Sequence, residues 1–128
     1  MFRAAIIVGI GGFLGSVLRF ISTTFFQKVF GTTFPLGTLI VNLVGSLLIG
    51  FLLGLFERGS LISPDLRIFL TVGFCGGFTT FSTFTNDTVN LVNDNELLYL
   101  MLYMGLSIFA GISFTFIGKN LVSVIWGN

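Results

Sequence analysis

Four long apolar stretches, joined by short polar connections, constrain this chain more than any other feature; they cover residues 4–26, 36–56, 66–91 and 97–126. A helix needs about 20 residues to cross the hydrocarbon core of a bilayer, and each stretch reaches that length. Inside lipid only helices and closed barrels satisfy their backbone hydrogen bonds. The stretches lack the alternation of barrel strands. The sequence therefore predicts an all-α membrane protein, one domain over residues 1–128 with four transmembrane helices.

Composition supports this prediction and excludes several function classes. Charged residues make up 9% of the chain, against about 25% in soluble domains. The net charge of +1 gives no basic footprint for nucleic acid. There is no histidine and only one cysteine, Cys75, so no disulfide within the chain and no nucleophile–base–orienter set is expected. We expect a lipid bilayer as partner and no enzymatic activity.

The cationic residues are expected to be divided unevenly: Arg3, Arg58, Arg67 and Lys119 on the side of the termini, against Lys28 and Arg19. The positive-inside rule then favours cytoplasmic termini. The bias is slight because three of these residues lie near or within spans. A weak bias permits insertion in both orientations, and an antiparallel homodimer becomes possible. In the connection before the third helix, Ser63-Pro64-Asp65 predicts a cap and first turn.

Small residues recur at a spacing of four along three of the helices: Gly11 and Gly15; Thr38, Asn42, Ser46, Gly50 and Gly54; Gly73 and Gly77. Lipid gives helices no hydrophobic reason to associate, so close packing through small residues is the usual substitute. Helix packing therefore explains most of the glycines. Asn42 needs a hydrogen-bond partner at this depth. An interhelical contact and a polar pore are both open explanations for it.

The third stretch contains the most informative segment, Gly-Phe-Cys-Gly-Gly-Phe-Thr-Thr-Phe-Ser-Thr-Phe over residues 73–84. Gly76-Gly77 and the Thr pair that follows are poor helix formers near the middle of the span. A break there frees backbone groups, which are tolerated at membrane depth only inside protein or beside a polar cavity. Freed carbonyls suit a hard cation such as sodium. A packing kink and an ion site are equal alternatives on spacing alone.

Neutral donors gather near this segment. Phe81 and Phe84 are three residues apart and share a helical face, and the positive edge of a phenyl ring suits an anion path. Ser82 and Thr83 add hydroxyl donors. A polar track follows the fourth stretch at spacings of four and eight: Tyr103, Ser107 and Thr115, with Gly111 in the gap.

Charges within the spans are few, and they are usually functional where they occur. Arg19 is the main exception, and either attracts anions at a vestibule or extends to the interface. Asp87 is expected near a helix end, paired with a cation or facing water. Proton-coupled export by a small multidrug antiporter needs an embedded carboxylate, and only Asp87 is a candidate. A non-transporting scaffold explains the glycines but not the clustered polar groups.

Gly-Thr-Leu-Ile-Val-Asn-Leu-Val-Gly over residues 37–45, together with the segment 73–84, resembles the signatures of the bacterial fluoride channels, the Fluc family. The Gly-rich first helix ending in Arg19-Phe20 is similar too, and the resemblance covers essentially the whole chain. It implies an antiparallel, dual-topology homodimer in the bacterial cytoplasmic (inner) membrane, with two fluoride pores lined by both subunits. It also implies one structural sodium ion at the interface and passive fluoride export that relieves toxicity.

The resemblance also implies roles for single residues. The pore residues are Asn42, Phe81, Phe84, Tyr103, Ser107 and Thr115, with Ser82 and Thr83 beside them. The backbone carbonyls of Gly76 and Thr79 match the sodium ligands, and Arg19 matches the vestibule arginine. Two departures are present: Asp87 stands where the family usually has Glu, and Gly111 stands where a hydroxyl residue is common.

Overall fold

The computed structural model describes residues 1–59 and 62–127, and these form helices joined by short connections. The elements are α1 (Phe2–Phe30), α2 (Leu36–Glu57), α3 (Pro64–Ile68), the π-helix η1 (Phe69–Cys75), α4 (Gly76–Phe78), α5 (Phe81–Asn93), α6 (Leu97–Gly105), the π-helix η2 (Leu106–Ala110) and α7 (Gly111–Trp126). The all-α prediction is confirmed for the described residues. Residues 60–61 of the predicted second connection and residue 128 of the predicted domain lie outside them.

Four helical spans are long and apolar enough to cross a membrane: Phe2–Phe30, Leu36–Glu57, Pro64–Asn93 and Leu97–Trp126. The third span comprises α3, η1, α4 and α5, and the fourth comprises α6, η2 and α7. This confirms the four predicted spans. The first helix is longer than the apolar stretch 4–26, because α1 continues through Gln27 to Phe30. Gly31 adopts a left-handed φ of 57° and its N–H donates to the Gln27 carbonyl, which ends the helix there.

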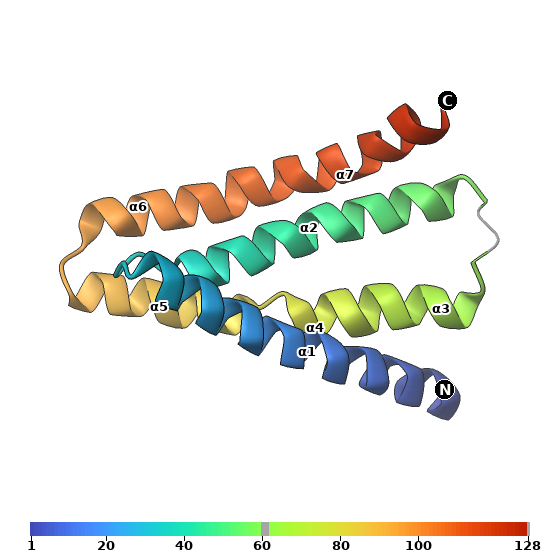
Figure 1. The fold of residues 1–128 in the computed structure, drawn as a ribbon, viewed down its shortest axis with the longest axis horizontal. Coiled ribbons are helices and arrows are strands. Elements are labelled where there is room, and N and C mark those ends of the chain that lie inside the picture. Colours follow the sequence, from blue (N-terminus) through green and yellow to red (C-terminus); the bar gives the residue numbers. More distant parts are fainter. Residues whose placement is uncertain (60–61, 128) are drawn as a thin grey trace.

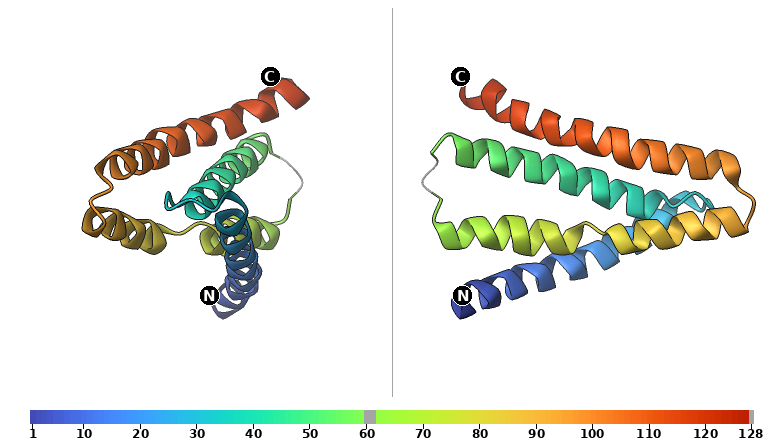
Figure 2. Two further views of the ribbon diagram at one scale, coloured as in Figure 1. Left: turned by 60° about the vertical axis from the view of Figure 1, so that its left-hand side comes forward. Right: turned by 180° about the vertical axis from the view of Figure 1, so that it is seen from behind.

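The spans form two closely packed pairs. α2 packs along α7, and α1 packs against η1 and α4. Figure 1 shows α7 running beside α2, while α1 lies against the third span. The chain begins and ends at the same end of the bundle, as both Figure 1 and the rear view in Figure 2 show. The opposite end carries the α1–α2 and α5–α6 connections.

Glycines permit both close pairings. A Cβ at Gly15 would overlap the Phe74 carbonyl, and a Cβ at Gly77 would overlap the Gly12 carbonyl, so α1 meets the third span backbone to backbone. In the other pair, a Cβ at Gly50 would overlap the backbone of Thr115. The interpretation of these glycines as packing residues is therefore confirmed.

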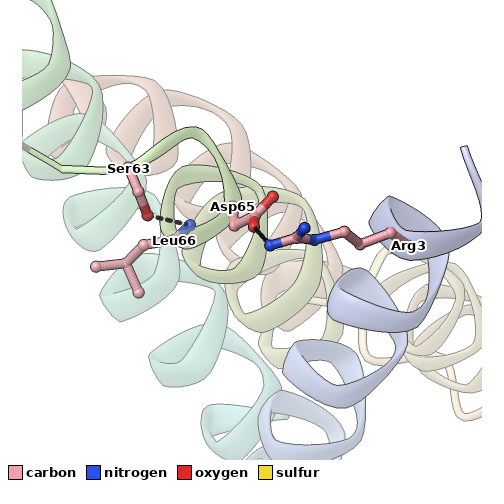
Figure 3. A network of polar contacts seen from close by, with 4 residues as sticks. All are labelled: Arg3, Ser63, Asp65 and Leu66. Carbon is pink, nitrogen blue, oxygen red and sulfur yellow. Dashed lines mark hydrogen bonds and ion pairs between the residues drawn. The ribbon is translucent and has the colours of Figure 1, made fainter.

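Several polar contacts lie at the end of the bundle that holds the termini, and Figure 3 shows part of them. The Ser63 hydroxyl accepts a hydrogen bond of 3.2 Å from the Leu66 N–H, so the predicted cap of the third span is confirmed. Arg3 pairs with Asp65 at 2.6 Å. Lys119 pairs with Glu57 at 2.8 Å, so α1 and the third span, and α2 and α7, are each joined by an ion pair.

Candidate functional site

The third span is interrupted at Thr79 and Thr80. Thr79 has φ −88° and ψ 158°, and Thr80 has φ −149° and ψ 124°, both extended. Gly76 and Gly77 stay helical within α4. The predicted mid-span break is confirmed, and within the predicted segment it falls at the Thr pair rather than at Gly76-Gly77. Gly77 crosses α1 closely at Gly12 and remains helical, whereas the two β-branched threonines take the extended conformation.

Asn42 on α2 satisfies the broken backbone. Its Nδ2 donates to the Thr80 carbonyl at 3.0 Å, and its Oδ1 accepts from the Thr80 N–H at 2.8 Å. One side-chain amide thus bonds both backbone groups of Thr80: it replaces the helical acceptor of the N–H, and it gives the carbonyl a second donor beside the first helical hydrogen bond of α5. Asn42 also lines a cavity beside the break. The interhelical contact of Asn42 is confirmed, and its role in a polar pore stays a prediction.

The break changes the partners of two carbonyl groups. In a continuous helix, the Thr80 N–H would donate to Gly76 and the Thr83 N–H to Thr79. Here the Thr80 N–H donates to Asn42, and the Thr83 N–H donates to the Thr80 hydroxyl at 3.2 Å. The carbonyls of Gly76 and Thr79 therefore lose their helical donors.

Thr80 also restarts the helix. Its Oγ1 accepts from the Thr83 N–H as the N-cap of α5, and it donates to the Thr83 hydroxyl at 3.1 Å. Thr is a favoured N-cap residue because its oxygen satisfies a free N–H of the first turn. The sequence signal for this cap was the Thr pair itself, which was interpreted only as helix-breaking.

A cavity of about 610 Å³ lies beside the break, between α2, the third span and η2. It is lined by Asn42, Gly45, Ser46, Ile49, Thr71, Cys75, Gly76, Thr79, Thr80, Phe81, Phe84, Ser107 and Ile108. Of the predicted pore residues it brings together Asn42, both phenylalanines and Ser107. The polar groups on its wall are amide, hydroxyl and backbone groups, and no charged side chain lines it.

An aromatic series leads away from the cavity. The ring of Phe84 lies 5.7 Å from that of Phe81 and 5.1 Å from that of Tyr103, between centroids. Phe81 is 65% exposed. Tyr103 is completely buried, does not line the cavity, and donates to Asp87 Oδ2 at 2.9 Å. Asp87 thus has an uncharged partner, where the sequence had suggested a cation or water.

The remaining predicted pore residues differ in their surroundings. Ser107 Oγ is buried without a hydrogen-bond partner among the described residues. Thr115 lies on a second, smaller cavity, and its hydroxyl approaches the carbonyls of Ser46 and Gly111 at 3.2 Å each. Ser82 and Thr83 are exposed at the start of α5 and line neither cavity.

Arg19 points toward the break. Its Nη1 donates to the Thr79 carbonyl over a long 3.4 Å, and the residue is half-buried. Neither of the two sequence explanations included this contact. No group of three His, Cys, Asp or Glu side chains positioned to hold a metal occurs in residues 1–59 and 62–127.

The π-helices η1 and η2 were not predicted. Both border the cavity, η1 through Thr71 and Cys75 and η2 through Ser107 and Ile108. A π-turn inserts one residue into the helical register and is frequent at functional sites. Local sequence gave no signal for these turns, because they depend on which side chains must face the neighbouring helices.

Four membrane-crossing helices, with a broken third span beside a polar cavity, define a multi-pass membrane protein. The model of the CrcB-like protein (camphor resistance, CrcB) family matches residues 6–119. The chain therefore belongs to the CrcB-like family.

Several relatives support this membership over nearly the full chain. A protein of Flavobacterium psychrophilum named fluoride-specific ion channel FluC is 44% identical, over 87% of this chain and 90% of the relative. Proteins with the same name are 46% identical in Chlorobium chlorochromatii, over 94% of this chain and 92% of the relative, and 40% identical in Clostridium perfringens, over 95% of both chains. The predicted family is confirmed.

Proposed function

We propose that this protein is a fluoride-selective ion channel that conducts fluoride passively and is not an enzyme. The observation that carries the proposal is the cavity at the break in the third span, whose polar lining consists of neutral groups. The relatives named fluoride-specific ion channels support the choice of ion. The small multidrug antiporter is disfavoured, because the carboxylate of Asp87 is bonded to Tyr103 and does not line this cavity.

The chemistry of the wall suits a small, strongly hydrated anion. Fluoride must exchange water for donors at close range, and conduction needs several weak sites rather than one strong site. Hydroxyl groups and the positive edges of phenyl rings supply partial positive charge without a full counter-charge that would trap the ion. Phe81 and Phe84 lie next to each other on the wall, so both rings are placed for successive contacts. A larger halide fits such a path too poorly to recover its dehydration cost.

The functional unit in this proposal is an antiparallel homodimer with two pores, each lined by both subunits. In the single chain, the ring of Phe81 is 65% exposed and the Ser107 hydroxyl is buried without a partner. Polar groups at membrane depth must face protein or a water-filled path. A second copy over this face would complete the wall, and the exposed Ser82 and Thr83 would then border the pore.

A structural sodium ion at the dimer interface is part of the proposal. The carbonyls of Gly76 and Thr79 would hold it, since both have lost their helical donors. Backbone oxygens are suitable ligands for a hard cation. Arg19 contacts the Thr79 carbonyl, but a carbonyl oxygen has two lone pairs and one remains for the ion. Arg19 then lies at the entrance, as expected for a vestibule residue.

In the cell, we place the channel in the bacterial cytoplasmic membrane, where it would release fluoride and relieve toxicity. The structure puts Arg67 in the first helix of the third span and pairs Lys119 with Glu57, so both lie with Arg3 and Arg58 at the end that holds the termini. This distribution favours cytoplasmic termini. The bias remains slight, because Lys28 lies at the opposite end, and insertion in both orientations stays part of the proposal.

Anion efflux from liposomes containing the purified protein tests the function. Fluoride loss without chloride loss is expected, and Phe81→Ile is expected to abolish it while the protein elutes as the wild type, because Phe81 is largely exposed in the chain. Comparable chloride flux would contradict selectivity. Absence of fluoride flux from well-folded protein would contradict the channel. Cysteine labelling at an introduced C-terminal cysteine, from each side of sealed vesicles, tests the two orientations.

A further inference from the structure

The polar track of the fourth span is interrupted at Gly111. Ser107, Gly111 and Thr115 are four residues apart and share a helical face. Glycine provides no hydroxyl at the middle position. Apart from its chain neighbours and the backbone of its own helix, a Cβ built at Gly111 would have one heavy atom within 4 Å. This atom is the Ser46 hydroxyl oxygen, at 3.8 Å. The space left by the missing side chain is therefore faced by a hydroxyl from α2.

Two cavities meet at this point. The second cavity, of about 370 Å³, is lined by Ser46, Ser107, Ile108, Gly111, Ile112 and Thr115. Ser46, Ser107 and Ile108 also line the larger cavity at the break. Ser46 and Ser107 thus line both the space beside Asn42 and Phe81 and the space beside Thr115.

The three hydroxyl groups along this space differ in what they offer an anion. The Thr115 hydroxyl is placed to donate to the carbonyl of Ser46 or of Gly111, at 3.2 Å from either, so its proton is engaged. The Ser107 hydroxyl is buried and has no partner among the described residues. Ser46 brings a second hydroxyl to the same passage. An anion here would meet donors from Ser46 and Ser107 rather than from Thr115.

We infer that Ser46 is an additional anion-contacting residue of this channel, whose hydroxyl replaces the side chain missing at Gly111. Ser46 and Ser107 form a two-hydroxyl site, contributed by α2 and η2, at the junction of the two cavities. The inference rests on the proposed fluoride conduction. The competing account is that the Ser46 hydroxyl bonds only to its own helix, as serines in membrane helices often do.

Fluoride efflux from liposomes tests this role with a rescue design. Ser46→Ala removes the donor and is expected to slow fluoride efflux about tenfold, the effect of losing one hydrogen bond to a charged group. Adding Gly111→Ser to Ser46→Ala is expected to restore most of the rate, since the open space at Gly111 accommodates a Cβ and the new hydroxyl points to the same place. The matched control is Ser113→Ala, which changes an exposed serine on α7, the helix of Gly111, and this variant should conduct as the wild type.

Each outcome is decisive. A wild-type rate for Ser46→Ala overturns the inference while the channel function stands, provided that the wild-type protein conducts. A slowed Ser46→Ala that Gly111→Ser does not rescue also overturns it, because a packing defect would not be repaired by a hydroxyl on another helix. If Ser46→Ala aggregates, Ser46→Cys gives the same comparison, as it keeps the size and weakens the donor. A non-conducting wild type removes the proposed function and this inference together.

Discussion

The two halves of the third span pack against different neighbours and in different ways, although they are continuous in sequence. The first half, through Phe78, packs against α1 with backbone contacts at glycines, and Phe78 is buried. The second half, α5, packs against α6 and presents Phe81 and hydroxyl residues outward. The break at Thr79-Thr80 separates a half that packs closely on α1 from a half that packs on α6, and both halves line the cavity. One span can thus be anchored firmly and still turn polar groups toward an ion path.

The largest effect is expected from Asn42→Ala, which removes the connection between α2 and the break. The Thr80 N–H loses its acceptor at membrane depth and the Thr80 carbonyl loses one of its two donors, and we expect a loss of about 2–5 kcal/mol in the free energy of unfolding. Thermal unfolding in detergent measures it. Asn90→Ala, at an exposed position of α5, is the control and should unfold as the wild type. An unchanged melting curve for Asn42→Ala would contradict the stabilising role of the Asn42–Thr80 hydrogen bonds at the break.

A somewhat smaller effect is expected from Gly15→Val, which disturbs the packing of α1 against the first half of the third span, here called the anchored half. The new side chain would overlap the backbone of Phe74 and Phe78, and the forced separation should cost about 1–3 kcal/mol of stability. Gly9→Val is the matched control on the same helix, because a Cβ at Gly9 meets nothing within 4 Å. Equal melting temperatures for the two variants would contradict the close crossing of α1 and the third span.

Thr80→Ala tests the break itself, which separates the two halves of the third span. It removes the N-cap of α5 but leaves the Asn42 contacts to the backbone, so a loss of about 1 kcal/mol is expected. Thr80→Ser keeps the capping oxygen and should retain most of the stability. Hydrogen exchange at the first turn of α5 should rise in the Ala variant only. A rise in both variants would show that the Thr80 methyl, rather than its hydroxyl, holds the turn.

The smallest effect is expected from Arg3→Gln, which breaks the ion pair with Asp65 at the end of the anchored half (Figure 3). The Arg3 side chain is 81% exposed, and exposed pairs contribute about 0–1 kcal/mol. The melting temperature should therefore change little and depend weakly on salt. A large loss would mean that this pair, rather than the glycine contacts, anchors α1 to the third span.

Much of the fold followed from local sequence. The length and apolar content of the four stretches determined the membrane-crossing helices, since lipid requires the backbone of a span to satisfy itself. The Ser63 cap was also readable from local residue types. The motifs over residues 37–45 and 73–84 identified the family by resemblance. Asn42 was a candidate site residue because a side-chain amide at membrane depth needs a hydrogen-bond partner.

Tertiary structure decided what local propensity leaves open. The break falls at Thr79-Thr80, where Asn42 bonds both backbone groups of Thr80, while Gly77 stays helical at its close crossing with Gly12 of α1. The π-turns, the burial of Tyr103 against Asp87 and the position of Ser46 opposite Gly111 likewise depend on neighbouring helices. Sequence alone determined which groups need partners in the membrane. Only packing between spans determined which partner each group receives, because the partners lie far apart along the chain.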